Sequence, residues 1–176
     1  QGVVYGLHTT ETRMNESLHT SFHYDSVFGT VLNRFVVQAV VGHPLTIYGK
    51  GGQTRGCLNI VDTVQCIDLA VRQPPNSSEY RVFNQFTEQF SIVQFAALVE
   101  KVSADIGLDP RRTHVADPRN ELEEHYYNPR HTKLLDLGLQ PHLLTEDVVR
   151  EMLEYVGQRK VNIDREVIVP KIKWEH

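Results

Sequence analysis

The chain has 176 residues, of which 40% are hydrophobic, so it can bury an ordinary globular core. It has 18 basic and 22 acidic residues, and the basic ones are scattered along the sequence. This balance excludes an electrostatic argument for nucleic acid or an anionic membrane as partner. Two cysteines cannot form a disulfide scaffold, and no apolar run reaches the ~20 residues of a membrane span.

The first predicted element is a buried strand over residues 1–6. Its apolar residues follow Gln1 with no polar lead-in, which favours a piece of a longer protein that begins inside a sheet; a processed N-terminus is the alternative. Residues 7–24 are polar and show little periodicity. We expect a loop there, and a loop of that length in a compact domain is usually functional or mobile.

A helix is predicted over residues 28–41, ended by Gly42 and followed by a short strand over residues 45–48. The apolar positions of this helix recur at helical spacing, and they are Phe28, Val31, Leu32, Phe35, Val36, Ala39 and Val40. A second strand is predicted over residues 57–61.

Asp62 is the predicted N-cap of the next helix, which reaches about Val71. Its predicted apolar stripe consists of Val64, Ile67 and Val71, spaced three and four residues apart. A strand is then predicted over residues 80–84.

Four further elements are predicted in the second half of the chain. Ser91 and Gln94 match a capping box that opens a helix ended by Gly107, and residues 114–116 are extended. A helix runs from Asn128-Pro129 to Gly138, and Thr145 caps a last helix through Tyr155, with Leu144 packing against it. Strands that alternate with helices predict an α/β fold with a mainly parallel sheet and no internal linker.

The most informative stretch is residues 48–55, Tyr-Gly-Lys-Gly-Gly-Gln-Thr-Arg. Glycines let a backbone approach a ligand closely, Arg55 can hold a phosphate through paired hydrogen bonds, and Tyr48 can stack on a base or sugar ring. It is not a P-loop, because Lys50 precedes the paired glycines and no Ser or Thr follows it. Half of a nucleotide-diphosphate site is one interpretation, and a plain hairpin turn is the other.

Other polar residues have weaker patterns. Arg119 could clamp the same diphosphate from the other side, or form a surface ion pair with nearby glutamates. Residues 125–128, His-Tyr-Tyr-Asn, could read sugar hydroxyls, although tyrosines more often pack a loop against a helix. His19 and His23 have the i, i+4 spacing of metal ligands on a helix, but the sequence places no third ligand, so a metal site is not predicted. No catalytic nucleophile stands out.

Several segments together resemble the UDP-sulfoquinovose synthase family, within the extended short-chain dehydrogenase/reductase superfamily. The segments that carry the resemblance are residues 1–6, 24–35, 42–56, 82–90 and 118–139. The resemblance covers nearly the whole chain and is closer to the plastid form than to the bacterial form.

The resemblance implies the C-terminal part of an NAD-binding Rossmann-like fold with its smaller substrate-binding domain. Residues 1–176 would supply the last strands of the NAD-binding domain, interleaved with the UDP-sugar-binding domain. The implied enzyme joins sulfite to UDP-glucose for sulfolipid synthesis. In the reaction that the resemblance implies, bound NAD would accept a hydride from C4 of the glucose, water would leave across C5–C6, sulfite would add at C6, and the hydride would return.

By position, the resemblance assigns cofactor-binding roles to Gln1 and Val4, on the nicotinamide side. It also assigns substrate contacts: the UDP part at Thr30 and Leu32, the uracil at Thr46 and Tyr48, the diphosphate at Arg55 and Arg119, and a lid at residues 10–14. It further implies a homodimer, a protein partner that donates sulfite, and a location in the plastid stroma or the bacterial cytoplasm.

Two features depart from the family pattern. Cys57 and Asn59 stand where the family has an aromatic and an acidic residue. The Gly-rich cofactor turn and the Tyr-x-x-x-Lys acid/base pair are missing from these residues and expected upstream of Gln1, so we expect this chain alone to catalyse nothing. Another NAD-dependent nucleotide-sugar epimerase or dehydratase, and a non-catalytic nucleotide-sugar-binding module, are the alternatives.

Overall fold

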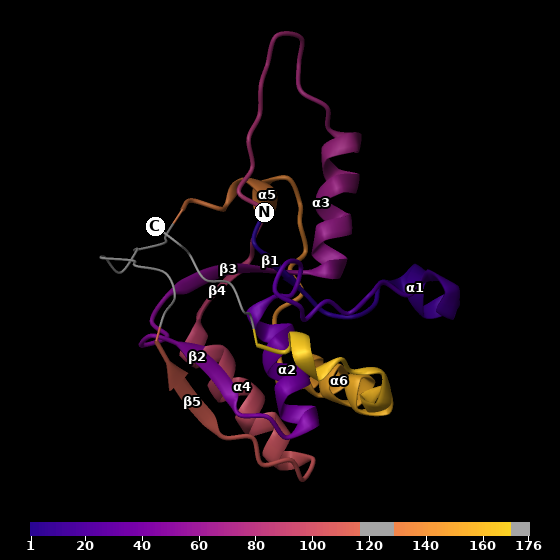
Figure 1. Ribbon diagram of the computed structural model, residues 1–176. Coiled ribbons are helices and arrows are strands. Elements are labelled where there is room, and N and C mark those ends of the chain that lie inside the picture. Colours follow the sequence, from indigo (N-terminus) through magenta and orange to yellow (C-terminus); the bar gives the residue numbers. More distant parts are fainter. Residues whose placement is uncertain (117–128, 170–176) are drawn as a thin grey trace.

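The computed structural model describes residues 1–116 and 129–169, and its strands lie in two small sheets (Figure 1). The first sheet has the order β1-β3-β4, made of Val3–Tyr5, Thr54–Asn59 and Glu88–Ser91. The second pairs β2 (Leu45–Tyr48) with β5 (Arg112–Val115). The β1–β3 and β2–β5 pairs are parallel, and β3–β4 is antiparallel. The α/β class is confirmed, but two sheets replace the single sheet that the alternation of elements suggested.

The main core lies between three helices and the inner faces of the strands. Helices α2 (Val31–Val41), α4 (Ile92–Asp105) and α6 (Glu146–Gln158) contact one another (Figure 1). Phe35, Phe95 and Met152 are fully buried among them. Because a fully buried side chain of this size contributes ~1.5–3 kcal/mol, this cluster is the main source of stability in the fold.

Helix α2 begins later than predicted. Its first residue follows Thr30, whose hydroxyl accepts a hydrogen bond from the backbone nitrogen of Asn33 at 3.2 Å. Phe28 is 71% exposed and lies in a turn closed by the Asp25 carboxylate, which accepts from the Phe28 backbone nitrogen at 2.9 Å. The predicted end is confirmed, since Gly42 adopts a left-handed conformation with φ 74.

The start of helix α3 (Ile60–Arg72) was predicted wrongly. Asn59, the last residue of β3, caps the helix by accepting from the Val61 backbone nitrogen at 3.0 Å. Asp62 therefore lies inside the first turn, where it is fully buried. The buried residues of α3 are Asp62 and Cys66.

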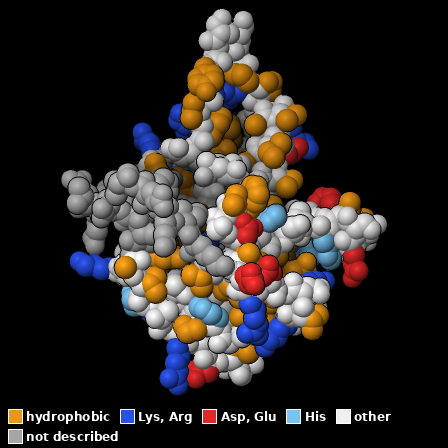
Figure 2. Space-filling view, in the orientation of Figure 1, with side chains coloured by type: hydrophobic (Ala, Val, Ile, Leu, Met, Phe, Trp, Pro, Cys, Tyr) orange, Lys and Arg blue, Asp and Glu red, His pale blue; other side chains and the backbone are white. Residues whose placement is uncertain are grey.

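The predicted apolar stripe of α3 is exposed. Val64, Ile67 and Val71 are 46%, 60% and 73% exposed. Hydrophobic side chains gather on the upper projection that α3 and the loop after it form in Figure 2. The prediction failed because the face that meets the rest of the described chain is the one with Asp62 and Cys66, where hydrogen bonds of Asp62 act beside a small apolar cluster around Cys66.

Local capping signals in the second half of the chain are confirmed. Ser91 and Gln94 form the predicted capping box, and Gly107 ends the helix region with φ 77. Thr145 caps α6 by accepting a hydrogen bond from the Val148 backbone nitrogen at 3.4 Å. Leu144 is buried in the main core, beside the start of α6.

Three other predictions need correction or completion. Residues 80–84 are irregular, and the strand that pairs with β3 is the later β4. The polar segment 7–24 contains helix α1 (Thr10–Met14) and the 3-10 turn η1 (Glu16–Leu18). Helix α5 (Lys133–Asp136) begins after Thr132 and not at position 129, while Asn128 lies outside the described residues. Two 3-10 turns, η2 (Lys160–Asn162) and η3 (Arg165–Val167), follow α6.

No helix in the described residues combines the length and apolar character needed to cross a membrane.

Candidate functional site

The Gly-rich turn connects strands of different sheets, so it is not a hairpin. It leaves β2, which pairs with β5, and enters β3, which pairs with β1 and β4. The Gly49 backbone nitrogen donates to the Val115 carbonyl at 2.9 Å, and the Val93 backbone nitrogen donates to the Gly51 carbonyl at 3.1 Å. These bonds fix the turn to the end of β5 and to the first turn of α4.

Gly51 shows why the turn needs glycine. Its φ is +77, and a Cβ there would lie 2.7 Å from Ile47 and 2.7 Å from Val93. Any side chain would therefore clash with β2 and α4. At this position glycine serves close packing of the turn against its own scaffold, which holds the two flanking strand ends in place.

Tyr48 and Arg55 stand at the two ends of this turn, as predicted. Tyr48 is the last residue of β2 and is half-buried. Arg55 is half-buried in β3, opposite Phe90 of β4, and its guanidinium donates to the Thr54 carbonyl at 3.1 Å. Among the described residues no carboxylate pairs with Arg55.

Thr46, predicted near the uracil, is tied to α2. Its backbone nitrogen donates to Gln38 Oε1 at 3.0 Å, and its hydroxyl accepts from Gln38 Nε2 at 3.3 Å. The same hydroxyl lies 3.3 Å from the Pro44 carbonyl oxygen, to which it can donate. The polar side chain of Thr46 is thus used inside the fold.

Thr30 and Leu32 lie at the start of α2. The Thr30 hydroxyl caps the helix, and the Leu32 side chain is buried in the main core. A ligand could therefore meet Leu32 through its backbone and not through its side chain. Helix N-termini have unpaired backbone N–H groups that suit a phosphate.

Val4 lies in β1, in the same sheet as Arg55, and Gln1 precedes that strand. Gln1 is exposed just before β1, and Val4 is half-buried and pairs in register with Leu58 of β3. The structure thus divides the predicted residues into a β1–β3 group and an α2–β2 group, joined by the Gly-rich turn. Arg119, the second predicted diphosphate arginine, lies outside the described residues.

The predicted lid, residues 10–14, is helix α1, and it is fastened to α6. Arg13 Nη2 lies 2.6 Å from Glu151 Oε1. Just before this helix the His8 ring packs between His19, at 4.6 Å between ring centroids, and Tyr155, at 5.8 Å. Burial lowers the pKa of His8 from its usual value, so this ring favours the neutral form.

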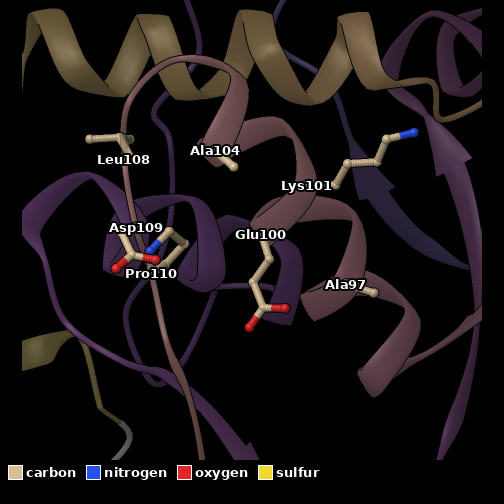
Figure 3. A pocket seen from close by; sticks show the side chains of 7 residues that line it. All are labelled: Ala97, Glu100, Lys101, Ala104, Leu108, Asp109 and Pro110. Carbon is tan, nitrogen blue, oxygen red and sulfur yellow. The ribbon is translucent and has the colours of Figure 1, made fainter.

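A shallow pocket of about 420 Å³ lies on the outer face of α4 (Figure 3). It is lined by Ala97, Glu100, Lys101, Ala104, Leu108, Asp109 and Pro110. Two of its charges are already neutralised, since Glu100 pairs with Arg112 and Lys101 with Glu146. No predicted site residue lines this pocket.

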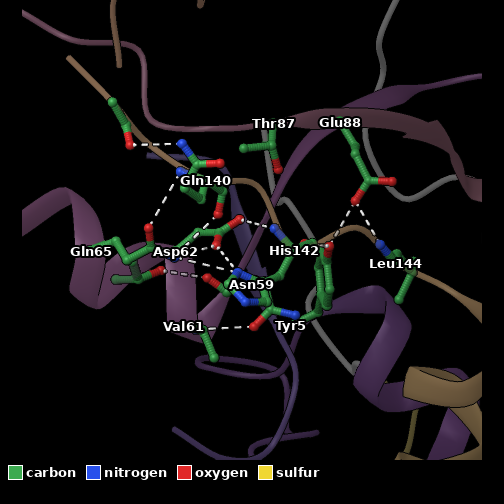
Figure 4. Close-up of polar contacts among 12 residues, drawn as sticks. Tyr5, Asn59, Val61, Asp62, Gln65, Thr87, Glu88, Gln140, His142 and Leu144 are labelled. Carbon is green, nitrogen blue, oxygen red and sulfur yellow. Dashed lines mark hydrogen bonds and ion pairs between the residues drawn. The ribbon is translucent and has the colours of Figure 1, made fainter. Parts of the chain in front are cut away.

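Sequence reasoning missed a buried polar network beside β1 (Figure 4). The Tyr5 hydroxyl lies 2.7 Å from a Glu88 carboxylate oxygen and 2.8 Å from the His142 carbonyl oxygen. The same Glu88 oxygen accepts from the Leu144 backbone nitrogen at 2.8 Å. Burial, together with the adjacent Glu88 carboxylate, raises the pKa of Tyr5 far above its usual value, so the hydroxyl stays protonated.

The network continues from the same loop into helix α3. Asp62 accepts from the His142 backbone nitrogen at 2.9 Å and contacts His142 Nδ1 at 2.7 Å. Gln65 and Gln140 add a second link, since the Gln140 backbone nitrogen donates to the Gln65 side chain at 3.3 Å (Figure 4). Two acidic residues were the sequence signal for this network. Glu88 lies in the segment 82–90 that carries the family resemblance, and Asp62 lies at the start of an apolar helix.

At the first departure from the family pattern, Cys57 is fully buried in β3. Burial raises the pKa of its thiol to about 12, with the Glu88 charge as a second cause. The thiol is therefore neutral and inert, because a thiolate is the reactive form. Asn59, at the second departure, is the N-cap of α3.

No protein-family model matches the chain. The chain is 55% identical over 175 residues to a chloroplastic UDP-sulfoquinovose synthase of Spinacia oleracea, and 43% identical over 176 residues to a UDP-sulfoquinovose synthase of Sulfolobus acidocaldarius. Each alignment covers 99% of this chain but only 36% and 44% of those relatives. The predicted resemblance is confirmed over a chain that spans less than half the length of these relatives.

The fold also has a match among solved structures. A UDP-glucuronic acid 4-epimerase from Bacillus cereus, in complex with UDP-glucuronic acid and NAD, superposes with a TM-score of 0.65 at 22% identity. The match covers 90% of this chain and 44% of the epimerase chain. It confirms the predicted α/β fold class, since the described elements correspond to part of the fold of that epimerase.

Proposed function

We propose that this chain, which is related to the UDP-sulfoquinovose synthases over 99% of its length, forms the uridine diphosphate end of such an enzyme's substrate site. The observation that carries the proposal is the fixed Gly-rich turn, with an aromatic ring at one end and, at the other, a guanidinium that pairs with no carboxylate of the described residues. Among the described residues, Arg55 has only a backbone carbonyl as partner. An arginine beside an anion site and a ring for stacking are the two groups that a nucleoside diphosphate needs.

Each substrate residue then has a role that its surroundings support. Tyr48 stacks on the uracil, beside the β2 backbone at Thr46. Arg55 donates charge-assisted hydrogen bonds to the diphosphate, and Arg119 is the proposed second clamp. The first turn of α2, at Thr30 and Leu32, offers backbone N–H groups to the UDP part, because both side chains are used within the fold.

NAD is the proposed cofactor, and this chain would hold only its nicotinamide end. Gln1 is exposed and its amide both donates and accepts hydrogen bonds, which suits a carboxamide, while Val4 adds an apolar side chain in β1. The sequence has no Gly-rich fingerprint for the NAD phosphates. When bound, NAD supplies reversible acceptance of a hydride from C4 of the glucose.

The acid/base pair of the proposed reaction is expected from residues outside this chain. Tyr5 does not supply it, because its hydroxyl is committed to Glu88 and its raised pKa keeps the proton in place. The whole protein would make UDP-sulfoquinovose from UDP-glucose and sulfite for sulfolipid synthesis. We propose that it works as a homodimer that receives sulfite from a protein partner, and that it resides in the plastid, as the name of the spinach relative says of that protein.

The test is the affinity of the full-length protein for UDP, measured by calorimetry. We predict that Arg55→Ala weakens binding by ~1–3 kcal/mol, the scale of a lost hydrogen bond to a charged group. Arg72→Ala is the control, since that arginine lies on α3 and pairs with Asp68. Equal affinities for the wild type and the Arg55 variant would remove Arg55 from the site.

The alternatives are separated by the products. The full-length protein is offered UDP-glucose and sulfite, and a sulfonated nucleotide sugar is expected. UDP-galactose in its place would indicate an epimerase, and UDP binding without turnover would indicate a non-catalytic binding module.

A further inference from the structure

Gln38 is a polar side chain in the most apolar part of the fold. It lies in α2 between Val37 and Ala39, and only 1% of it is exposed. A buried amide is costly unless its donors and acceptors are bonded. The hydrogen-bond partners of Gln38 therefore indicate which part of the fold this side chain holds in place.

The oxygen and the nitrogen of the Gln38 side-chain amide both form hydrogen bonds with Thr46. Oε1 accepts from the Thr46 backbone nitrogen at 3.0 Å, and Nε2 donates to the Thr46 hydroxyl oxygen at 3.3 Å. The hydroxyl in turn is placed to donate to the Pro44 carbonyl, at 3.3 Å. Every donor of Thr46 is thus taken by the protein itself.

The direction of the backbone groups in β2 decides which of them Thr46 can offer to a ligand. Leu45 and Gly49 donate their backbone N–H groups to β5, at 2.7 Å to the Arg111 carbonyl and 2.9 Å to the Val115 carbonyl. Because backbone groups alternate along a strand, Thr46 directs its N–H and its carbonyl to the opposite edge. With the N–H bonded to Gln38, the carbonyl oxygen is the backbone group that Thr46 can offer at this edge.

We propose that Gln38 is a positioning residue for selection of the base. Gln38 accepts from the Thr46 N–H and donates to the Thr46 hydroxyl, which is left to donate to Pro44, so the carbonyl oxygen is what Thr46 offers a base at this edge of β2. Uracil has a donor at N3 and cytosine has an acceptor there, so an acceptor at Thr46 favours uracil and disfavours cytosine. The inference rests on the proposed uridine diphosphate site and adds the residue that sets its preference for the base.

The experiment compares the affinities of the full-length protein for UDP, thymidine diphosphate and CDP by calorimetry. The wild type is expected to prefer UDP and thymidine diphosphate, which both have the N3 donor, over CDP. In Gln38→Met, which keeps the volume but frees the Thr46 N–H, the UDP-to-CDP preference is expected to fall about tenfold, the scale of one hydrogen bond. Gln38→Glu, which keeps an acceptor for that N–H, is expected to retain most of the preference.

A matched control separates base selection from stability. Ser103→Ala changes another fully buried polar residue of the main core, whose hydroxyl has no partner among the described residues. It is expected to leave the ratio of affinities unchanged. A Gln38→Met protein that melts at a lower temperature but keeps the wild-type ratio would overturn the proposal, and so would a Gln38→Glu protein that loses the preference while folding normally.

The outcomes also distinguish the two proposals. If the wild type binds UDP and Arg55→Ala weakens it, but Gln38→Met keeps the ratio, the role of Gln38 alone is wrong. If the wild type binds none of the three nucleotides, the uridine diphosphate site is wrong, and the inference falls with it.

Discussion

Helices α2 and α3 have the same kind of apolar pattern and opposite surroundings. In α2 the apolar residues from Leu32 to Val41 are buried against α4 and α6. In α3 the apolar stripe at Val64, Ile67 and Val71 is exposed, and the buried side has Asp62 and Cys66. Periodicity therefore identifies a helix and its apolar face, but the face that is buried depends on which neighbours the fold supplies.

The two helices are held by different forces. Helix α2 is stabilised by apolar burial in the main core. Helix α3 has a small cluster of Cys66, Leu134 and Leu139, and its other links to the 140–142 loop are hydrogen bonds. Mutations in the two regions should therefore change the free energy of unfolding by different amounts and for different physical reasons.

The largest effect is expected in the main core. Phe35→Ala removes a side chain that is 1% exposed, and it should lower the free energy of unfolding by ~3–5 kcal/mol, through lost burial and a cavity. Ile67→Ala, on the exposed stripe of α3, should change it by less than ~0.5 kcal/mol. Urea unfolding of both variants tests the comparison, and similar losses would mean that the α3 stripe is buried after all.

A smaller effect is expected from the polar attachment of α3. Asp62→Ala leaves the His142 backbone nitrogen without its acceptor, and should cost ~2–4 kcal/mol. Asp68→Ala is the matched control on the same helix. It breaks an exposed ion pair with Arg72, which is worth only ~0–1 kcal/mol. If the two variants unfold at the same urea concentration, the network around Asp62 does not hold α3.

Signals that act within a few residues could be read from the sequence. The Ser91–Gln94 capping box, Gly42 and the Thr145 cap are where they were predicted, because each bond lies within one helical turn. Asp62 was misread because Asn59, an equally good cap, precedes it, and because its real partner is His142, 80 positions away. A contact at that separation leaves no local trace.

The candidate site divides in the same way. The turn from Tyr48 to Arg55 was evident, because its glycines, aromatic ring and arginine are consecutive. The hydrogen bond between Gln38 and Thr46 was not evident, because it joins a helix to a strand. A glutamine in an apolar helix gives no sequence signal for the residue that it bonds. Strand β4 was missed because Glu88 and Gln89 are polar and become strand residues only by pairing with β3.

The smallest effect concerns Tyr5, where β1 meets the loop that holds α3. Tyr5→Phe removes the hydroxyl between Glu88 and His142, and should cost ~1–2 kcal/mol at about pH 7, since Leu144 still donates to Glu88. The pKa of Tyr5 is raised above the ~10 of an unfolded tyrosine. The stability from its neutral hydroxyl is therefore fully present below about pH 10 and is lost as the pH rises further, when only the unfolded phenol ionises.

The phenylalanine variant lacks this ionisation, so its deficit relative to the wild type should shrink between about pH 9 and pH 11. Urea unfolding at several pH values measures the gap. Tyr80→Phe is the control, because Tyr80 is 90% exposed on the loop after α3 and should differ from the wild type by less than ~0.5 kcal/mol. A deficit for Tyr5→Phe that stays constant with pH would show that the hydroxyl is not buried against Glu88, and that α3 is attached without help from β1.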